Sequence, residues 1–114
     1  MITARITGPK GPTKSGIASI LMRLRVELVL ASGQAQLYLV ADEPDEQAAV
    51  IRQIRTSSAS RHALVLAVAD EASPAHVREA LAAGADDYLV WPFDPELLLF
   101  KLEQASARGR LKAG

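Results

Sequence analysis

The sequence has no cysteine, few aromatic residues, no net charge and no long hydrophobic run. The lack of cysteine excludes disulfide bonds and thiolate metal sites. The 13 basic and 13 acidic residues cancel, so the charge balance does not indicate a nucleic-acid or membrane partner. No apolar run reaches the roughly 18 residues that a membrane-spanning helix needs, and the N-terminal MITARITGPK lacks the apolar core of a signal peptide. We therefore expect a cytoplasmic domain.

The sequence does contain enough aliphatic residues for one hydrophobic core. Hydrophobic residues occupy 49% of the 114 positions and charged residues 23%, which is typical of a single globular domain. Because aromatic residues make up only 4%, the core has to be built from Leu, Val, Ile and Ala. No internal repeat or linker divides the chain.

Short apolar runs alternate along the chain with segments of helical periodicity. The candidate strands are residues 2–7, 37–41, 63–68 and 87–91. Residues 26–32 are either a further strand, which we prefer, or the tail of the first helix. Strands that alternate with helices predict a parallel sheet covered by helices on both faces.

Proline and polar residues mark the expected helix starts. The first helix is expected to be capped by Thr13 or Ser15, and the second to begin in the acidic segment 42–46. The other two are expected to begin at Ser73-Pro74 and Asp94-Pro95. Gly84 is expected to end the third helix.

The second half of the chain resembles a known family. The segment ALVLAVADEASPAHVREALAAGADDYLVWPFDPELLLFKL, which starts at residue 63, resembles the last two strand–helix units of response-regulator receiver domains, most clearly in GADDYL and the Pro-Phe that follows. The resemblance extends over roughly residues 36–104. It implies a flavodoxin-like, CheY-like three-layer α/β sandwich in residues 1–104, with residues 105–114 as a frayed tail or linker. Because residues 8–42 leave hardly any room for a second helix, either the second strand–helix unit is shortened or residues 26–32 do something different.

The residues that carry the family's chemistry are mostly replaced. In that family two acidic residues after the first strand help to hold Mg²⁺, an Asp after the third strand accepts a phosphoryl group, and a hydroxyl and a Lys contact that group. Asp42 matches the phosphoacceptor, whereas Ala69 stands at the hydroxyl position and Trp91 at the Lys position. The loop at 8–14, GPKGPTK, has no acidic residue.

The resemblance therefore implies a degenerate receiver, or pseudo-receiver, of two-component phosphorelay signal transduction. Such a domain is expected not to bind Mg²⁺ or another cofactor, not to be an enzyme, and to work as a phosphorylation-independent module for protein interaction or dimerisation. The alternative is an atypical response regulator that is still phosphorylated on Asp42.

Residues 8–16, GPKGPTKSG, come close to a phosphate-binding loop. Gly8, Lys14 and Ser15 fall in the register G-x-x-x-x-G-K-[ST], but Thr13 stands where the second Gly belongs. That Gly lets the backbone approach the phosphate closely. We interpret the segment as a loop followed by a helix start.

A weaker use of the same loop stays open. Lys10, Lys14 and Ser15, together with the helix N-terminus, are an alternative site for an anion or nucleotide. A further hypothesis is that Lys10 or Lys14 forms an ion pair with Asp42, which would give a charged site without a metal.

Two aromatic residues lie near the degenerate site. Tyr88 matches the aromatic residue that reports phosphorylation in the family, and without phosphate chemistry we interpret it as a packing residue. Trp91 is the only Trp, and we expect it to plug the vacated phosphate pocket, with an exposed binding anchor as the alternative. His62 and His76 have no nucleophile or second His at a useful spacing and are expected at the surface or in loops.

The last helix carries four consecutive apolar residues, Leu97-Leu98-Leu99-Phe100. A helix cannot turn all four toward one side, so at least one of Leu98, Leu99 and Phe100 is expected to face partly outward. The resemblance implies that the last strand and helix contact a protein partner or a second copy of the chain. We therefore take these three residues as a candidate interface for a homodimer.

Overall fold

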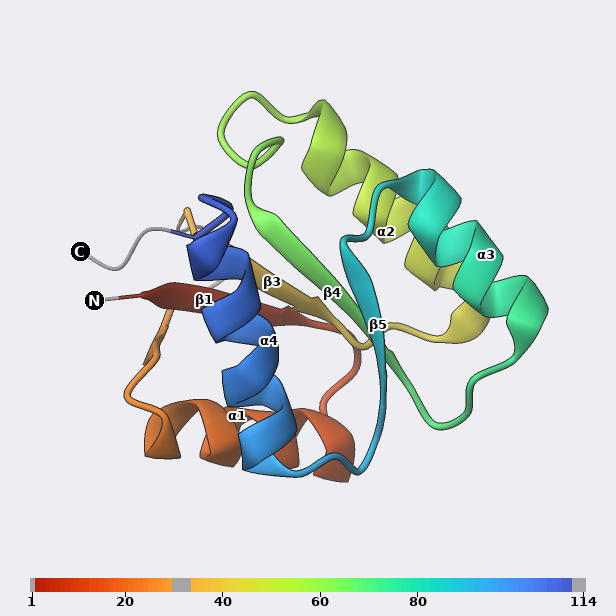
Figure 1. The fold of residues 1–114 in the computed structure, drawn as a ribbon. Helices are drawn as coiled ribbons and strands as arrows, with labels where there is room; N and C mark the ends of the chain where they lie inside the picture. The colour runs from red at the N-terminus through yellow and green to blue at the C-terminus, as the bar shows by residue number, and fades with distance from the viewer. Residues whose placement is uncertain (1, 30–33, 112–114) are drawn as a thin grey trace.

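Figure 1 shows the computed structural model of the chain, which describes residues 2–29 and 34–111. Strands and helices alternate along it, as the sequence predicts. In chain order the described elements are β1 (Thr3–Thr7), α1 (Pro12–Arg23), β2 (Glu27–Leu28), β3 (Leu37–Val40), α2 (Pro44–Thr56), β4 (Leu64–Ala69), α3 (Pro74–Ala83), β5 (Asp87–Val90) and α4 (Pro95–Ala107).

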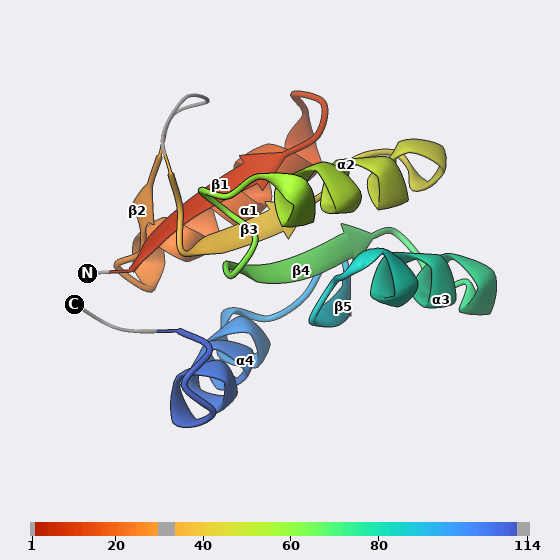
Figure 2. The same cartoon turned by 90° about the horizontal axis from the view of Figure 1, so that it is seen from above.

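The strands form one parallel sheet in the order β2-β1-β3-β4-β5. Helices α1 and α4 cover one face of this sheet, and α2 and α3 cover the other (Figures 1 and 2). The predicted three-layer sandwich is therefore confirmed. In a parallel sheet the carboxyl ends of all strands meet at one edge, so the loops after β1, β3, β4 and β5 gather there.

Each face of the sheet has its own aliphatic core. Side chains of α1 and α4 pack on one set of strand residues, and those of α2 and α3 on the alternating set. The largest side chains with almost no exposure are Ile17, Leu21, Leu37, Leu39, Ile51, Leu66, Leu98, Val40, Val65 and Val68. None of them is aromatic, as the composition predicts.

Proline opens all four described helices. The residues before Pro12, Pro44, Pro74 and Pro95 occupy the N-cap positions, and none of them makes a side-chain capping hydrogen bond. The prediction that Thr13 or Ser15 caps α1 is wrong. Because proline fixes φ and needs no N–H partner, it starts the helix ahead of both residues.

Gly84 ends α3, as predicted, with φ of 121°. Only glycine adopts this backbone conformation without strain. There is also no room for a side chain, because a Cβ on Gly84 would lie 2.8 Å from Cγ of Arg55.

The second strand–helix unit is short, as predicted. α1 ends in a tight turn in which Val26 N–H donates to the carbonyl of Leu21 and Arg25 has φ of 60°. β2 follows directly and contains only Glu27 and Leu28. Among the described residues between β2 and β3 there is no helix. Residues 30–32 of the predicted strand lie outside the described part of the chain.

The last helix extends into residues 105–114, the segment that the sequence analysis expects to be a frayed tail or linker. α4 runs to Ala107, and Ala105 and Leu111 are buried. The chain is therefore not frayed from residue 105 through residue 111. None of the described helices has the length and apolar character to cross a membrane.

Candidate functional site

A cleft of about 570 Å³ opens at the carboxyl edge of the sheet. It is formed by the residues that follow β1, β3 and β4 and by the first turns of α1, α2 and α3. Its lining consists of Pro9, Lys10, Gly11, Pro12, Thr13, Lys14, Ala41, Asp42, Glu43, Pro44, Val68, Ala69, Asp70, Glu71 and His76. Asp42 and Ala69, two of the predicted site positions, thus lie together in one cleft.

Asp42 is partly buried and tied to the neighbouring strand end. Its Oδ1 accepts a hydrogen bond of 2.5 Å from the hydroxyl of Thr7, the last residue of β1. Gly8 comes next, and a Cβ there would lie 2.6 Å from the carbonyl oxygen of Ala41. The close approach of the loops after β1 and β3 therefore requires glycine at position 8, which also has φ of 117°.

Gln47 braces the strand ends below this carboxylate. It lies in the first turns of α2 and is 2% exposed. Its Nε2 donates to the carbonyl of Val40 at 2.9 Å and to that of Val68 at 3.0 Å. One amide group therefore joins the carboxyl ends of β3 and β4, immediately before the two loops that carry Asp42 and Ala69.

The charges around the cleft are mixed. Lys10 and Lys14 come from the α1 side, and the acidic side comprises Asp42, Glu43, Asp70 and Glu71. Nζ of Lys14 donates to the carbonyl of Gly8 at 3.3 Å. The ion pairs found among the described residues do not include either lysine with Asp42, so the hypothesis of such a pair is wrong. Asp42 instead has the uncharged hydroxyl of Thr7 as its partner.

The described acidic and histidine side chains of the cleft do not gather into a metal site. Mg²⁺ needs several oxygen ligands in octahedral geometry. In the described part of the chain no three His, Cys, Asp or Glu side chains come close enough to hold a metal ion together. The described residues of this cleft therefore do not supply the ligand set that Mg²⁺ requires in a working receiver domain.

Trp91 turns away from this cleft. Its ring lies edge-on to Phe93, with the centroids 5.1 Å apart, and packs against the core on the α1 and α4 side. A Cβ on Gly16 of α1 would lie only 2.3 Å from Cζ2 of Trp91. Because Trp91 does not line the cleft, the prediction that it plugs the phosphate pocket is wrong. It is half-buried against α1, so it does not stand out as an anchor either.

Tyr88 contacts the loop after β4. Its hydroxyl donates to the backbone carbonyl of Glu71 at 3.3 Å. Burial raises the pKa of Tyr88 above its ordinary value of 10.0, and the nearby charge of Glu71 raises it further. The side chain is therefore neutral at physiological pH and links β5 to the rim of the cleft.

Only the first part of residues 8–16 forms a loop, which is shorter than the phosphate-binding motif suggests. α1 already begins at Pro12, so Thr13, Lys14 and Ser15 belong to its first turn. The connection between β1 and α1 is left with residues 8–11. Lys10 and Lys14 line the cleft, whereas Ser15 does not.

The apolar run of α4 divides between core and surface. Leu98 has no exposed surface, whereas Leu99 and Phe100 are 42% and 53% exposed. The expectation that at least one residue faces outward is confirmed, but Leu98 is wrong as an interface residue. Leu97 is exposed too, and so are Leu81 of α3 and Val90 of β5.

Three residues of the site were not found from the sequence. Thr7 and Gln47 are ordinary polar residues whose partners lie 35 and 7 positions away. Gly16 lies inside a helix, where glycine is unfavourable, and that was the one signal that a close contact occurs there. His76, expected at the surface or in a loop, lies in α3 and lines the cleft.

The fold is shared with known structures. CheY4, a chemotaxis protein of Vibrio cholerae, matches with a TM-score of 0.79 at 20% identity, over 91% of this chain and 98% of its own. The protein has the fold of a response-regulator receiver domain. No protein-family model matches the sequence, and neither does any curated protein.

Two further similar structures are receiver domains solved with magnesium or in a BeF3-activated state. The receiver domain of the sensor histidine kinase PA1611 from Pseudomonas aeruginosa has a magnesium ion coordinated in its active-site cleft. It matches with a TM-score of 0.75 at 18% identity, over 90% of this chain and 95% of its own. The BeF3-activated DrrB receiver domain matches with a TM-score of 0.79 at 18% identity, over 95% and 99%. At these identities the likeness extends to the receiver fold alone.

Proposed function

We propose that this chain is a cytoplasmic, receiver-like domain of two-component signal transduction that acts through protein contacts and does not depend on phosphorylation. It carries out no catalysis, needs no Mg²⁺ and binds neither nucleic acid nor membrane. Its partner is a second copy of itself.

The observation that carries this proposal is the donor set of the cleft. Asp42 is bound to the hydroxyl of Thr7, and the loop after β1 and the first turn of α1 bring Lys10 and Lys14 where a metal site would need carboxylates. Ala69 offers a methyl group in place of a hydroxyl. A phosphoryl group on Asp42 would therefore lack the metal ion and the donors that stabilise its transfer.

The contact surface proposed for self-association is the exposed apolar part of α4. Leu97 and Phe100 lie three residues apart and so share one flank of the helix, whereas Leu99 lies on the other. Exposed side chains of this size on one element are typical of a protein contact. The net charge of zero means that two copies do not repel one another.

A thermal melt tests the independence from phosphorylation. The purified domain is melted with Mg²⁺ alone and with Mg²⁺ plus beryllofluoride, a phosphoryl analogue, and Asp42→Asn is treated in the same way. We expect no shift in Tm for either protein, because Asp42 has no metal-binding partners. The BeF3-activated DrrB domain is a suitable positive control.

The alternative function, phosphorylation of Asp42, rests on the position of this carboxylate in the cleft. A rise in Tm with beryllofluoride that is lost in Asp42→Asn would establish this alternative and overturn the proposal. A rise in Tm with nucleotide or phosphate that is lost in Lys14→Ala would instead assign anion binding to the loop at residues 8–16.

A further inference from the structure

The chain turns back after α4 and runs along the amino edge of the sheet. Arg110 N–H donates to the carbonyl of Ala105 at 2.8 Å, and Gly109 N–H donates to that of Ser106 at 3.0 Å. Gly109 has φ of 74°, which closes the turn as in a common helix C-cap. The turn brings Leu111 into the core, where it is 3% exposed.

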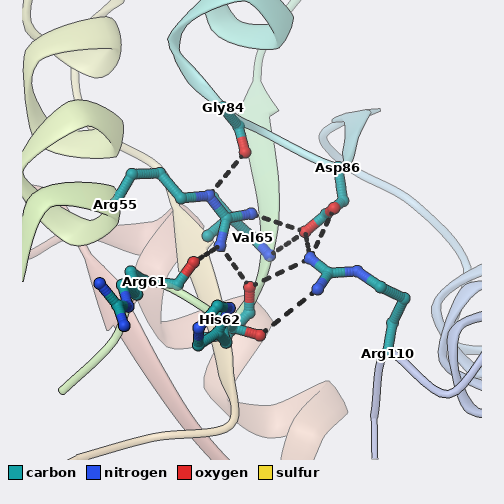
Figure 3. Close-up of polar contacts among 8 residues, drawn as sticks. Arg55, Arg61, His62, Val65, Gly84, Asp86 and Arg110 are labelled. Carbon is teal, nitrogen blue, oxygen red and sulfur yellow. Dashed lines mark hydrogen bonds and ion pairs between the residues drawn. The ribbon is translucent and has the colours of Figure 1, made fainter. Parts of the chain in front are cut away.

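Arg110 then meets Asp86, the residue that precedes β5 (Figure 3). Its Nη2 donates to both carboxylate oxygens of Asp86, at 2.8 and 2.9 Å. Asp86 also accepts the backbone N–H of Val65 at 2.9 Å, which fixes the carboxylate to the start of β4. The segment after the last helix is thus held by a carboxylate that belongs to the sheet.

The same carboxylate is shared with a second arginine. Nη2 of Arg55, near the end of α2, donates to Oδ2 of Asp86 at 2.9 Å, and its Nε donates to the carbonyl of Gly84 at 2.9 Å. Nη1 of Arg55 donates to the carbonyls of Arg61 and Ala63. The position of Asp86 therefore depends on α2 and on the corner between α3 and β5, which comprises residues 84–86.

We propose that Arg110 and Leu111 form a latch that holds residues 108–111 against the domain, and that the latch stays closed only while residues 84–86 keep their position. Arg110 supplies the polar contact and Leu111 the apolar one. Displacement of α3 or β5 moves Asp86 and releases the segment. The latch would convert a contact on the α3 and β5 side into a change where the chain leaves the domain.

The latch is more than an exposed ion pair between two surface side chains. Such isolated pairs contribute little because each side chain loses freedom to form them. Here Arg55 and the N–H of Val65 already hold Asp86 in place, so Arg110 meets a fixed carboxylate. Pairs in a network with several charge-assisted hydrogen bonds are stronger than single surface pairs.

Trypsin reads the state of the latch directly, because it cleaves after Arg108 when residues 108–111 are released. The full chain is digested at low enzyme concentration and the fragments are followed by mass spectrometry. In Arg110→Gln and Asp86→Asn we expect cleavage after Arg108 to be faster by about three- to tenfold, since loss of a fixed charge pair raises the open population by about that factor. Raising the salt concentration should speed this cleavage in the unmodified chain but not in Arg110→Gln.

Asp87→Asn is the matched control. It lies next to Asp86 and breaks a different ion pair, the 2.7 Å contact of Asp87 with Lys101 of α4. Cleavage after Arg108 should keep its original rate in this variant. Cleavage after Arg52, inside α2, monitors global unfolding in every sample.

Gly84→Ala tests the dependence on the α3–β5 corner without touching Arg110. The added Cβ would lie 2.8 Å from Cγ of Arg55 and displace that side chain from Asp86. We expect faster cleavage after Arg108, beyond any change in cleavage after Arg52. The proposal is overturned if Arg110→Gln leaves the Arg108 rate unchanged. It is also overturned if the Arg108 and Arg52 rates rise in proportion in every latch variant, because the segment would then open only with global unfolding.

Discussion

Gly16 of α1 leaves room for the ring of Trp91, which packs directly against it. Glycine inside a helix costs about 1 kcal/mol relative to alanine, yet here the face of α1 that would carry a side chain is covered by the Trp91 ring. The two residues are 75 positions apart in the sequence. Trp91 was recognised from the sequence as a replaced site residue, but its partner could not be, because no local pattern encodes a contact at that separation.

Gly16→Ala is expected to destabilise the protein although alanine favours the helix. The new Cβ would lie 2.3 Å from Cζ2 of Trp91, so the ring has to move. Overpacking of this kind costs about 1–3 kcal/mol, which outweighs the gain in helix propensity. Urea unfolding measures the loss, and the emission of the single Trp should shift as the ring becomes more exposed.

Ser19→Ala, an exposed position in the same helix, is the control and should change stability by less than about 0.5 kcal/mol. If Gly16→Ala were as stable as the original protein, with unchanged Trp91 emission, the ring would not be packed on α1. Combining it with Trp91→Phe should remove most of the penalty.

At the scale of elements, the helices and strands could largely be predicted and their junctions could not. The four helices described begin with the prolines that the sequence displays. The capping residue of α1 was missed because the proline starts the helix earlier than Thr13. The brace made by Gln47 was missed because an amide in a helix gives no sign of which carbonyls it reaches. Only the packing of α2 across β3 and β4 brings both acceptors to it.

Gln47→Leu is expected to loosen the junction of β3, β4 and α2. It keeps the size of the side chain but removes both hydrogen bonds to the carbonyls of Val40 and Val68. Leaving buried acceptors without this donor costs about 1–3 kcal/mol. Urea unfolding should show this loss, and amide hydrogen exchange at the ends of β3 and β4 should become faster.

The matched control is Gln53→Leu, an exposed position in the same helix that should stay within about 0.5 kcal/mol of the original protein. Equal stability of the two variants would mean that the bridge across the strand ends contributes nothing.

Among the described residues, α4 carries three large hydrophobic side chains that the fold leaves exposed. α4 buries Leu98, Leu102 and Ala105 against the sheet and leaves Leu97, Leu99 and Phe100 outside. Exposed hydrophobic side chains also occur singly on other elements: Leu81 lies in α3, and Met22, at the end of α1, is 68% exposed. Sequence periodicity predicted that the apolar run must divide, and the register of the helix on the sheet decided which residues are exposed.

Phe100→Ser and Leu99→Ser are expected to weaken self-association while the domain stays folded. Both side chains are largely exposed in the single chain, so their loss leaves no cavity in the core. Sedimentation velocity over a range of concentrations should show a monomer where the original chain forms a dimer.

Two further variants serve as controls for this experiment. Met22→Ser removes an even more exposed apolar side chain on another helix and should leave association unchanged. Leu98→Ala should instead cost about 2–5 kcal/mol in unfolding free energy, because it opens a cavity in the core. A chain that is monomeric at every concentration would refute self-association, although not the independence from phosphorylation.

The sequence by itself determined the layers of the fold, and the resemblance predicted which site residues of receiver domains are replaced. Both follow from short-range information: apolar runs and helical periodicity define the elements, and the residue at each strand end can be read directly. Asp42, Ala69 and Trp91 were therefore placed correctly at the ends of β3, β4 and β5, and a short second unit was expected from the chain length available.

Only the tertiary structure decided which of these residues meet. It paired Asp42 with Thr7 and not with a lysine, turned Trp91 onto Gly16, and joined Arg110 to Asp86. The physical reason is that hydrogen bonds and packing depend on the register and rotation of whole elements. These are set jointly by the two cores on either face of the sheet, and no single segment contains that information.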